Sequence, residues 1–352
     1  MMTIGEARRR AARFEQPDRV PMIFGINAAC WHHYPREALR DLMLAHPLLF
    51  PGLPADAQPW AQILPPYQRA GQAYTDFWGC VWATADDGIT GTVQGHPLAD
   101  WSALERFVPP DPAVSDGVTA LDWERIGRDF AAARQAGRGA RGGLAHGHTF
   151  LRLCDLRGYE NLILDMAEKE PRLGRLLEMV EAFNLALVRN YVARGADWMG
   201  YPEDLGMQVG PMLSPAHFRR YIKPVYQRLI APARAAGCII HMHSDGDIRT
   251  LVEDLLEGGV EVLNLQDLVN GLDWIRQTLK GRVCIDLDLD RQSVTARGTP
   301  RQIDELVRRE ISELGSRAGG LMMVYGLYPG VPLENVRAVM DAMERYAGYF
   351  QG

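Results

Sequence analysis

The chain has 352 residues, of which 47% are hydrophobic and 23% are charged, an ordinary globular composition with enough length for one large core. Its formal net charge of -6, without a run of like charges, gives no reason to expect nucleic acid or a membrane surface as partner, so we predict a small-molecule substrate. The five cysteines lie far apart and form no C-x-x-C pair, which argues against a disulfide framework and a four-thiolate zinc site.

The first segment of the chain, MMTIGEARRRAARF, is charged and has a helical pattern. It lacks the apolar stretch of a signal peptide, and no run of about 18 uncharged apolar residues follows anywhere in the sequence. We therefore expect a cytoplasmic protein with a helical extension at its N-terminus.

Short apolar or alternating runs, each followed by a helical stretch, recur along the chain. In order they are RVPMIFG from Arg19, GLAHGHTF from Gly143, ADWMGYPEDLG from Ala196, GCIIHMHSDGD from Gly237, VEVLNLQD from Val260, RVCIDLDLD from Arg282 and GGLMMVYG from Gly319. Periodic segments from Pro171 and from Thr299 carry Pro near the start and Gly past the end, as helices prefer. This alternation indicates βαβ units and parallel strands.

The number of these units favours a closed barrel over an open sheet. An eighth strand could lie within residues 60–95, where Pro, Gly and aromatic residues obscure the period. No glycine-rich dinucleotide or phosphate loop follows any strand, which disfavours enzymes that use those loops. The predicted fold class is α/β, a single (β/α)8 TIM-type barrel with an N-terminal helical extension.

Polar residues interrupt the predicted strands with a period of two. In a parallel barrel such residues point inward, and those at the carboxyl ends of the strands reach the active-site mouth. The sets that share a face are Asp286, Asp288 and Asp290; His241, His243 and Asp245; His146 and His148; and Asn264 and Gln266, while Glu203 and Asp204 follow their strand. Each residue alone could equally be structural, Asp290 for example as a turn or helix cap, and the position of Asp286 deep in its strand favours a structural over a catalytic role. Their convergence favours a functional site, because unpaired buried charges are costly.

Several blocks resemble one family. They are QPDRVPM at Gln16, GMQVGPMLSPAHFRRYIKPV at Gly206, HSDGDI at His243, VEVLNLQ at Val260, DRQ at Asp290, GTP at Gly298, GGL at Gly319 and PLEN at Pro332. In order and spacing they resemble the uroporphyrinogen decarboxylase superfamily, from about residue 15 to the C-terminus. The resemblance implies one barrel domain over residues 1–352 and two candidate activities.

The decarboxylase branch of that superfamily holds the carboxylates of its substrate with arginines on an N-terminal loop. The corresponding segment here has no Arg between Arg19 and Arg36. A porphyrinogen with many carboxylates would therefore lack charge-assisted anchors. Asp76, in YTDFWG, also departs from the motif of that branch's catalytic Asp.

The methyltransferase branch binds zinc through an H-x-C-G motif and a distant Cys. Here His243 matches the His of the motif, Asp245 stands in place of its Cys, and the segment around the last strand has no Cys. The resemblance thus implies a harder ligand set of imidazole nitrogens and carboxylate oxygens. Zinc is the first choice for the divalent metal, with manganese or iron as alternatives. A corrinoid is an external acceptor that methyl-transferring members use.

The predicted site combines three groups of residues. Predicted metal ligands are Glu203, His241, His243 and Asp288; predicted catalytic residues are Asp204 and Asp245; predicted substrate-binding residues are Asn27, His146, His148, Gln266 and Tyr325. The first functional hypothesis is a metal-assisted methyltransferase that moves a methyl group from a small O- or N-methylated donor to a corrinoid or thiol. The alternatives are a decarboxylase or lyase of a small carboxylic acid, and a metal- or corrinoid-binding protein without turnover. A corrinoid protein and a second copy of the chain are the candidate partners.

Overall fold

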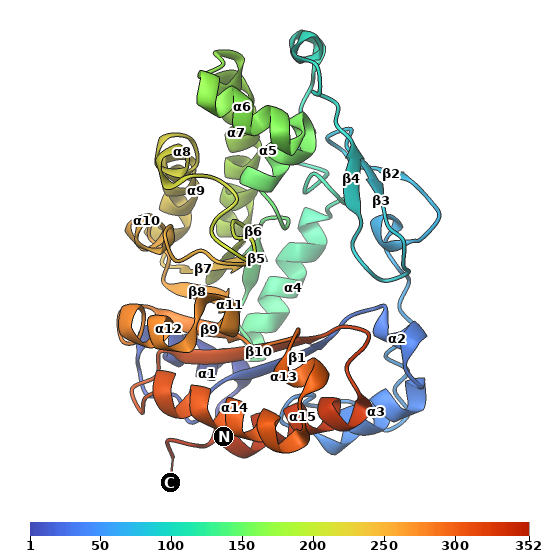
Figure 1. The fold of residues 1–352 in the computed structure, drawn as a ribbon, viewed down its shortest axis with the longest axis vertical. Helices are drawn as coiled ribbons and strands as arrows, with labels where there is room; N and C mark the ends of the chain where they lie inside the picture. The colour runs from blue at the N-terminus through green and yellow to red at the C-terminus, as the bar shows by residue number, and fades with distance from the viewer. Residues whose placement is uncertain (352) are drawn as a thin grey trace. The chain divides into compact units, whose positions relative to one another are not determined.

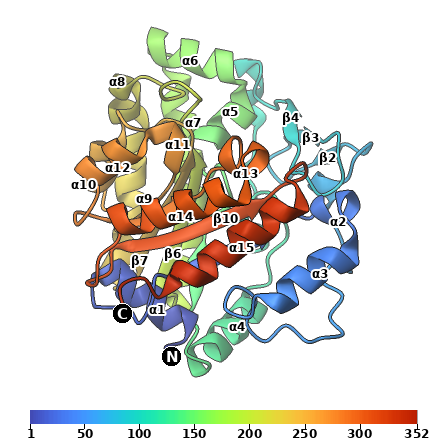
Figure 2. The ribbon, with the colours of Figure 1, turned by 60° about the horizontal axis from the view of Figure 1, so that its bottom comes forward.

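The computed structural model describes residues 1–351, and the chain divides into two compact units. Unit 1 comprises residues 1–73, 83–92 and 266–352, and unit 2 comprises residues 74–82 and 93–265. Figure 1 and Figure 2 show their helices and strands. The prediction of a single domain stays a prediction.

Unit 1 is built on three parallel strands in the order β1, β10, β9. The strands are β1 (Met22–Ile26), β9 (Cys284–Asp288) and β10 (Leu321–Leu327). Its helices are α1 (Ile4–Arg13), α2 (Cys30–His33), α3 (Arg36–Ala45), η1 (Pro66–Gln68), α11 (Asp267–Asn270), α12 (Leu272–Thr278), α13 (Val294–Arg297), α14 (Pro300–Leu314) and α15 (Leu333–Ala347). Helices α14 and α15 lie side by side (Figure 2).

Local sequence explains where the elements of unit 1 begin and end. The Thr299 side chain caps α14 in a capping box with Gln302, and Pro300 occupies the first turn. The carboxylate of Asp286 on β9 lies 3.5 Å from Arg8 of α1, a contact that agrees with the structural role expected for it. Asp290 accepts hydrogen bonds from the backbone N–H groups of residues 292–295, so it caps the following turn as predicted.

Unit 2 contains four parallel strands in the order β8, β7, β6, β5. They are β5 (Arg141–Gly143), β6 (Trp198–Asp204), β7 (Ile239–Asp245) and β8 (Val262–Gln266), of which the last residue is counted with unit 1. The helices are η2 (Trp101–Arg106), α4 (Trp123–Gln135), α5 (Phe150–Arg157), α6 (Tyr159–Glu168), α7 (Arg172–Ala193), α8 (Pro215–His217), η3 (Phe218–Ile222), α9 (Lys223–Ala235) and α10 (Val252–Glu257). None of the helices within residues 1–351 combines the length and apolarity needed to cross a bilayer.

The predicted α/β class is confirmed, because six of the seven predicted runs contain most of a parallel strand and the seventh, GLAHGHTF, begins at the last residue of one. The expectation of an eighth barrel strand in residues 60–95 is wrong for the described structure. That segment contributes to a small separate sheet of β2 (Tyr74–Thr75), β3 (Val81–Ala83) and β4 (Thr92–Gly95), in which β2 and β3 are antiparallel. Two antiparallel strands can be joined by a short turn. Gly79 lies in the turn between β2 and β3, and its φ of 83° is a left-handed conformation that glycine adopts readily.

One predicted strand is shorter than its pattern suggested. The run GLAHGHTF was expected to place His146 and His148 on a strand, but β5 ends at Gly143. The next residues form a loop in which Gly147 has a φ of 71°, a left-handed conformation that breaks strand geometry. The loop still follows β6, since the N–H of Leu144 donates to the carbonyl of Gly200 over 3.0 Å.

Candidate metal centre

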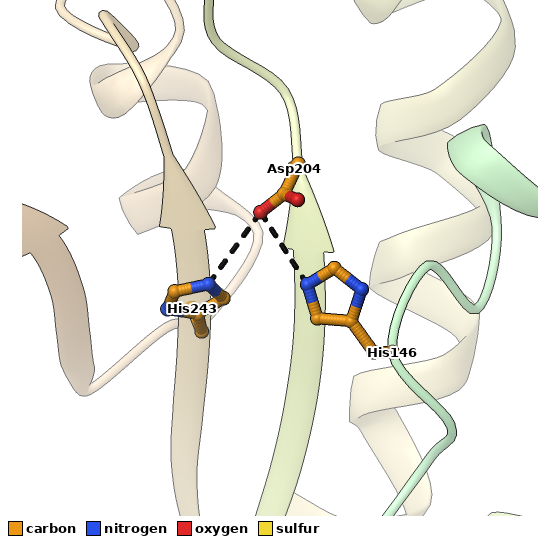
Figure 3. A group of neighbouring side chains, drawn as sticks. All are labelled: His146, Asp204 and His243. Carbon is orange, nitrogen blue, oxygen red and sulfur yellow. Dashed lines mark ion pairs between the residues drawn. The ribbon is translucent and has the colours of Figure 1, made fainter. Parts of the chain in front are cut away.

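Three side chains of unit 2 converge at the carboxyl ends of its strands. His146 lies on the loop after β5, Asp204 ends β6, and His243 lies on β7 (Figure 3). The Oδ1 atom of Asp204 is 3.4 Å from Nε2 of His146 and 3.5 Å from Nε2 of His243. One ligand atom from each residue lies within 4.8 Å of the other two. The carboxylate therefore joins two imidazoles into one cluster.

Neighbouring groups fix the orientation of the cluster. Asn264 is the register partner of His243 on β8, and its Oδ1 atom contacts Nδ1 of His243. If Nδ1 carries the proton it donates to Asn264, and Nε2 then faces Asp204. The backbone N–H of Asp245 donates to Oδ1 of Asp204 over 3.1 Å. The imidazole and the carboxylate are thus held before any ligand binds.

Mutual charge sets the protonation of the cluster. Burial would raise the pKa of Asp204, but hydrogen bonds from His146 and His243 outweigh burial and hold that pKa well below its usual range. Burial would likewise lower the pKa of His243, but its hydrogen bond with Asp204 and the charges of Asp245 and Asp204 raise it to about 9. Without a metal ion, the cluster is therefore an imidazolium beside a carboxylate.

The donor set and its spacing fit a divalent metal ion. Catalytic zinc sites typically use three nitrogen or oxygen ligands and leave a position open, and two His with one carboxylate also suit iron. Ligand atoms about 2.0–2.1 Å from a tetrahedral zinc stand about 3.3–3.4 Å apart, close to the 3.4 and 3.5 Å found here. The side chains of His146, Asp204 and His243 are 52%, 30% and 22% exposed, so an ion can reach them from solvent.

Glu203, a predicted metal ligand, lies outside the three-residue cluster and accepts three hydrogen bonds, and its ligand role stays a prediction. Successive strand residues point to opposite faces, so β6 brings Asp204 rather than Glu203 to the imidazoles. The carboxylate of Glu203 is fully buried and accepts hydrogen bonds from the N–H groups of Thr149 and Phe150 at 3.1 and 2.7 Å, and from the Tyr226 hydroxyl at 2.6 Å. Burial raises the pKa of Glu203 and the hydrogen bonds lower it; burial has the larger effect, and the pKa is about 7.

The contacts of Glu203 bear on the metal cluster. Thr149 and Phe150 begin α5, directly after the loop that carries His146. Glu203 therefore ties that loop to β6, the strand that carries Asp204. Tyr226, on α9, completes the network. The sequence analysis did not identify Tyr226 and Asn264 as residues that hold the site in place. The alternation of VEVLNLQ did place Asn264 on a polar strand face. Nothing in the helical pattern distinguished Tyr226.

His148 and His241 lie outside the three-residue cluster. His148 is 3% exposed and its Nδ1 is 2.6 Å from the Thr149 hydroxyl. Burial, with the nearby charge of His146, lowers its pKa to about 3. His241 precedes His243 by one pleat on β7 and its ring lies 5.8 Å from that of Trp198. The metal-ligand role of His241 and the substrate-binding role of His148 stay predictions.

Asp245 lies beside the cluster, with Oδ1 3.7 Å from Nε2 of His243. Its side chain is 37% exposed. A carboxylate there can interact with a ligand held by the imidazoles, which agrees with the catalytic role predicted for it. That role stays a prediction.

The other predicted residues belong to unit 1. Asn27 accepts a hydrogen bond from the N–H of Ala29, Asp288 forms a 2.8 Å ion pair with Arg291, and the hydroxyl of the buried Tyr325 donates to Thr295 over 3.2 Å. Gln266 ends β8, where its carbonyl accepts from the side chain of Asn270. The ligand and substrate roles of these residues stay predictions.

Comparison with known proteins gives concordant results. The model of the uroporphyrinogen decarboxylase (URO-D) family matches residues 149–346. The chain is 33% identical over 184 residues to a uroporphyrinogen decarboxylase of Thermus thermophilus, covering 52% of this chain and 51% of that protein. It is 27% identical over 270 residues to the human uroporphyrinogen decarboxylase, covering 72% and 69%. The chain thus spans about half the length of the Thermus relative.

A solved structure shares the fold. A methyltransferase from Methanosarcina mazei superposes with a TM-score of 0.66 at 19% identity, over 98% of this chain and 99% of that one. At this identity the likeness shows the fold alone. It confirms the TIM-type barrel class that the strand and helix pattern predicted.

Proposed function

The chain belongs to the uroporphyrinogen decarboxylase family, and on that premise we propose that it is a metal-dependent methyltransferase. It takes a methyl group from a small O- or N-methylated donor and passes it to a corrinoid or thiol acceptor. The observation that supports this is the cluster of His146, Asp204 and His243, which offers two nitrogens and one oxygen within 4.8 Å of one another. A divalent ion, zinc in the first place, would be held by these three residues.

When bound, the ion acts as a Lewis acid toward the oxygen or nitrogen that carries the methyl group. In the transfer, the methyl–heteroatom bond breaks, its electron pair stays with the heteroatom, and the nucleophilic acceptor supplies the electron pair of the new bond. Asn264 would orient the imidazole of His243, and Asp204 contacts both imidazoles. The carboxylate of Asp245, 3.7 Å from His243, would accept a hydrogen bond from a water molecule and orient it to protonate the departing heteroatom.

Decarboxylation of a small carboxylic acid is the second candidate. It is favoured by the raised pKa of His243, about 9, because a protonated imidazole can donate to the carbanion left by loss of carbon dioxide. This reading needs no metal.

The two activities are separated by one experiment. Purified protein is analysed for metal, stripped with a chelator, reloaded with zinc, manganese or iron(II), and incubated with methoxylated aromatic donors and cob(I)alamin. Formation of methylcobalamin only in the reloaded protein would support methyl transfer. Release of carbon dioxide from small acids by the stripped protein would instead support decarboxylation, and metal uptake without either product would leave a binding protein.

Metal uptake should depend strongly on pH. The pKa of His243 is about 9 in the metal-free chain, whereas a metal-bound imidazole has lost that proton. Apparent affinity should therefore fall as pH drops below about 9, by about tenfold per unit, or about a hundredfold between pH 9 and 7. Titration calorimetry in two buffers of different ionisation enthalpy should show release of one proton per ion at pH 7.5. Equal affinity at pH 7 and 9 without proton release would contradict ligation by His243.

A further inference from the structure

Unit 1 contains a pocket whose lining includes none of the predicted site residues. It follows the carboxyl ends of β9 and β10 and has a volume of about 520 Å³, within the range of small-molecule sites. Its lining residues are Arg291, Gln292, Ala296, Arg297, Tyr328, Pro329, Gly330 and Val331. Two arginines thus line one cavity together with a tyrosine and apolar residues.

Of the two arginines that line the pocket, only one carries a positive charge without a paired carboxylate. Arg291 forms a 2.8 Å ion pair with Asp288, which balances its charge, and its guanidinium carbon lies 5.4 Å from the centre of the Tyr328 ring. Arg297 is exposed in the last turn of α13, and no carboxylate pairs with it in the part of the chain that the structure describes. One unbalanced positive charge suits a monoanion better than a phosphate dianion.

Hydrogen bonds from other side chains hold the two chain segments that line the pocket. Asn335 donates from Nδ2 to the carbonyls of Thr295 and Gly298 at 3.0 and 2.9 Å, which holds the wall that carries Arg297. The hydroxyl of Tyr34 donates to the carbonyl of Val331 over 2.7 Å, which holds the opposite wall. A cavity with fixed walls loses little entropy when a ligand binds.

We propose that this pocket binds the carboxylate group of a small organic acid. The planar forks of Arg291 and Arg297 match the two oxygens of a carboxylate. The apolar body of the acid would rest against Tyr328, which is 42% exposed, and against Val331. This pocket takes no part in the proposed methyl transfer and contains none of the residues of the metal cluster.

The test measures binding of benzoate to the full chain, with benzamide as the neutral analogue and phenyl phosphate as the dianion. We expect saturable benzoate binding with a dissociation constant of order 1 mM, and no saturation by benzamide at the same concentrations. The variant Arg297→Gln should bind benzoate about ten- to a hundredfold more weakly, because a charge-assisted contact is lost. Arg291→Lys keeps a positive charge beside Asp288 but removes the planar guanidinium group. It should therefore also weaken benzoate binding, while the protein stays folded.

Arg301→Gln is the matched control, since Arg301 has the same charge, lies on the exposed side of α14 and pairs with Glu305. It should leave benzoate binding unchanged. Stripping the metal should change nothing either, so failure of the methyltransferase proposal and failure of this inference are distinguishable. Equal binding of benzamide, tighter binding of phenyl phosphate, or parental affinity in Arg297→Gln would overturn the inference.

Discussion

The variant Asp204→Asn should lower the affinity for divalent metal by about a hundredfold or more. Asp204 supplies the oxygen that both imidazoles approach, at 3.4 and 3.5 Å, and an amide oxygen carries no charge to stabilise the ion. Changes to groups that only support metal ligands cost about 10- to 100-fold, so loss of a direct ligand should exceed that range. Metal content after dialysis and calorimetric titration measure the effect.

The same variant has a second readout that needs no metal. Asp204 is a main cause of the raised pKa of His243, about 9. In Asp204→Asn the pKa of His243 should fall, because burial, which lowers it, is then opposed mainly by Asp245. Asp273→Asn is the control, since Asp273 has a side chain 71% exposed on α12. Parental metal affinity together with an unchanged His243 pKa would remove Asp204 from the site.

The variant Glu203→Gln should destabilise the protein and loosen the metal site together. All three hydrogen-bond partners of Glu203 donate to it, and an amide NH2 group cannot accept from them. One buried donor left unpaired costs about 1–3 kcal/mol of the free energy of unfolding. Because the network holds the loop that carries His146, metal affinity should also fall about tenfold. Denaturant titration and metal titration measure the two effects separately.

Glu168→Gln provides the comparison, since Glu168 is exposed at the end of α6. It should leave stability within about 0.5 kcal/mol of the parent and metal affinity unchanged. A Glu203→Gln protein with reduced stability but parental metal affinity would show that Glu203 supports only the fold. Parental stability would contradict the hydrogen-bond network itself.

Patterns in the chain were enough to predict six of the parallel strands, the longer helices and the polar face of β7. Period-two alternation in GCIIHMHSDGD places His243 and Asp245 on one face of β7, and helix signals at Pro171 and Thr299 predicted α7 and α14 within one residue of their starts. These features are local, because chain stereochemistry sets the periods of strands and helices and the preferences at helix ends. The family likeness carried by HSDGDI was likewise readable in the chain, and the comparisons bear it out.

Which polar side chains meet depends on how the strands and helices pack. Glu203 and Asp204 are neighbours in the sequence, and which of them faces His243 depends on the register of β6 against β7, where Asp204 pairs with Asp245. A shift of one residue would have exchanged their faces. The place of His146 depends on a turn at Gly147 and on hydrogen bonds from the start of α5 to Glu203, a residue distant in the chain. Local periodicity carries no information on such contacts, because they arise only when segments far apart in the sequence come together.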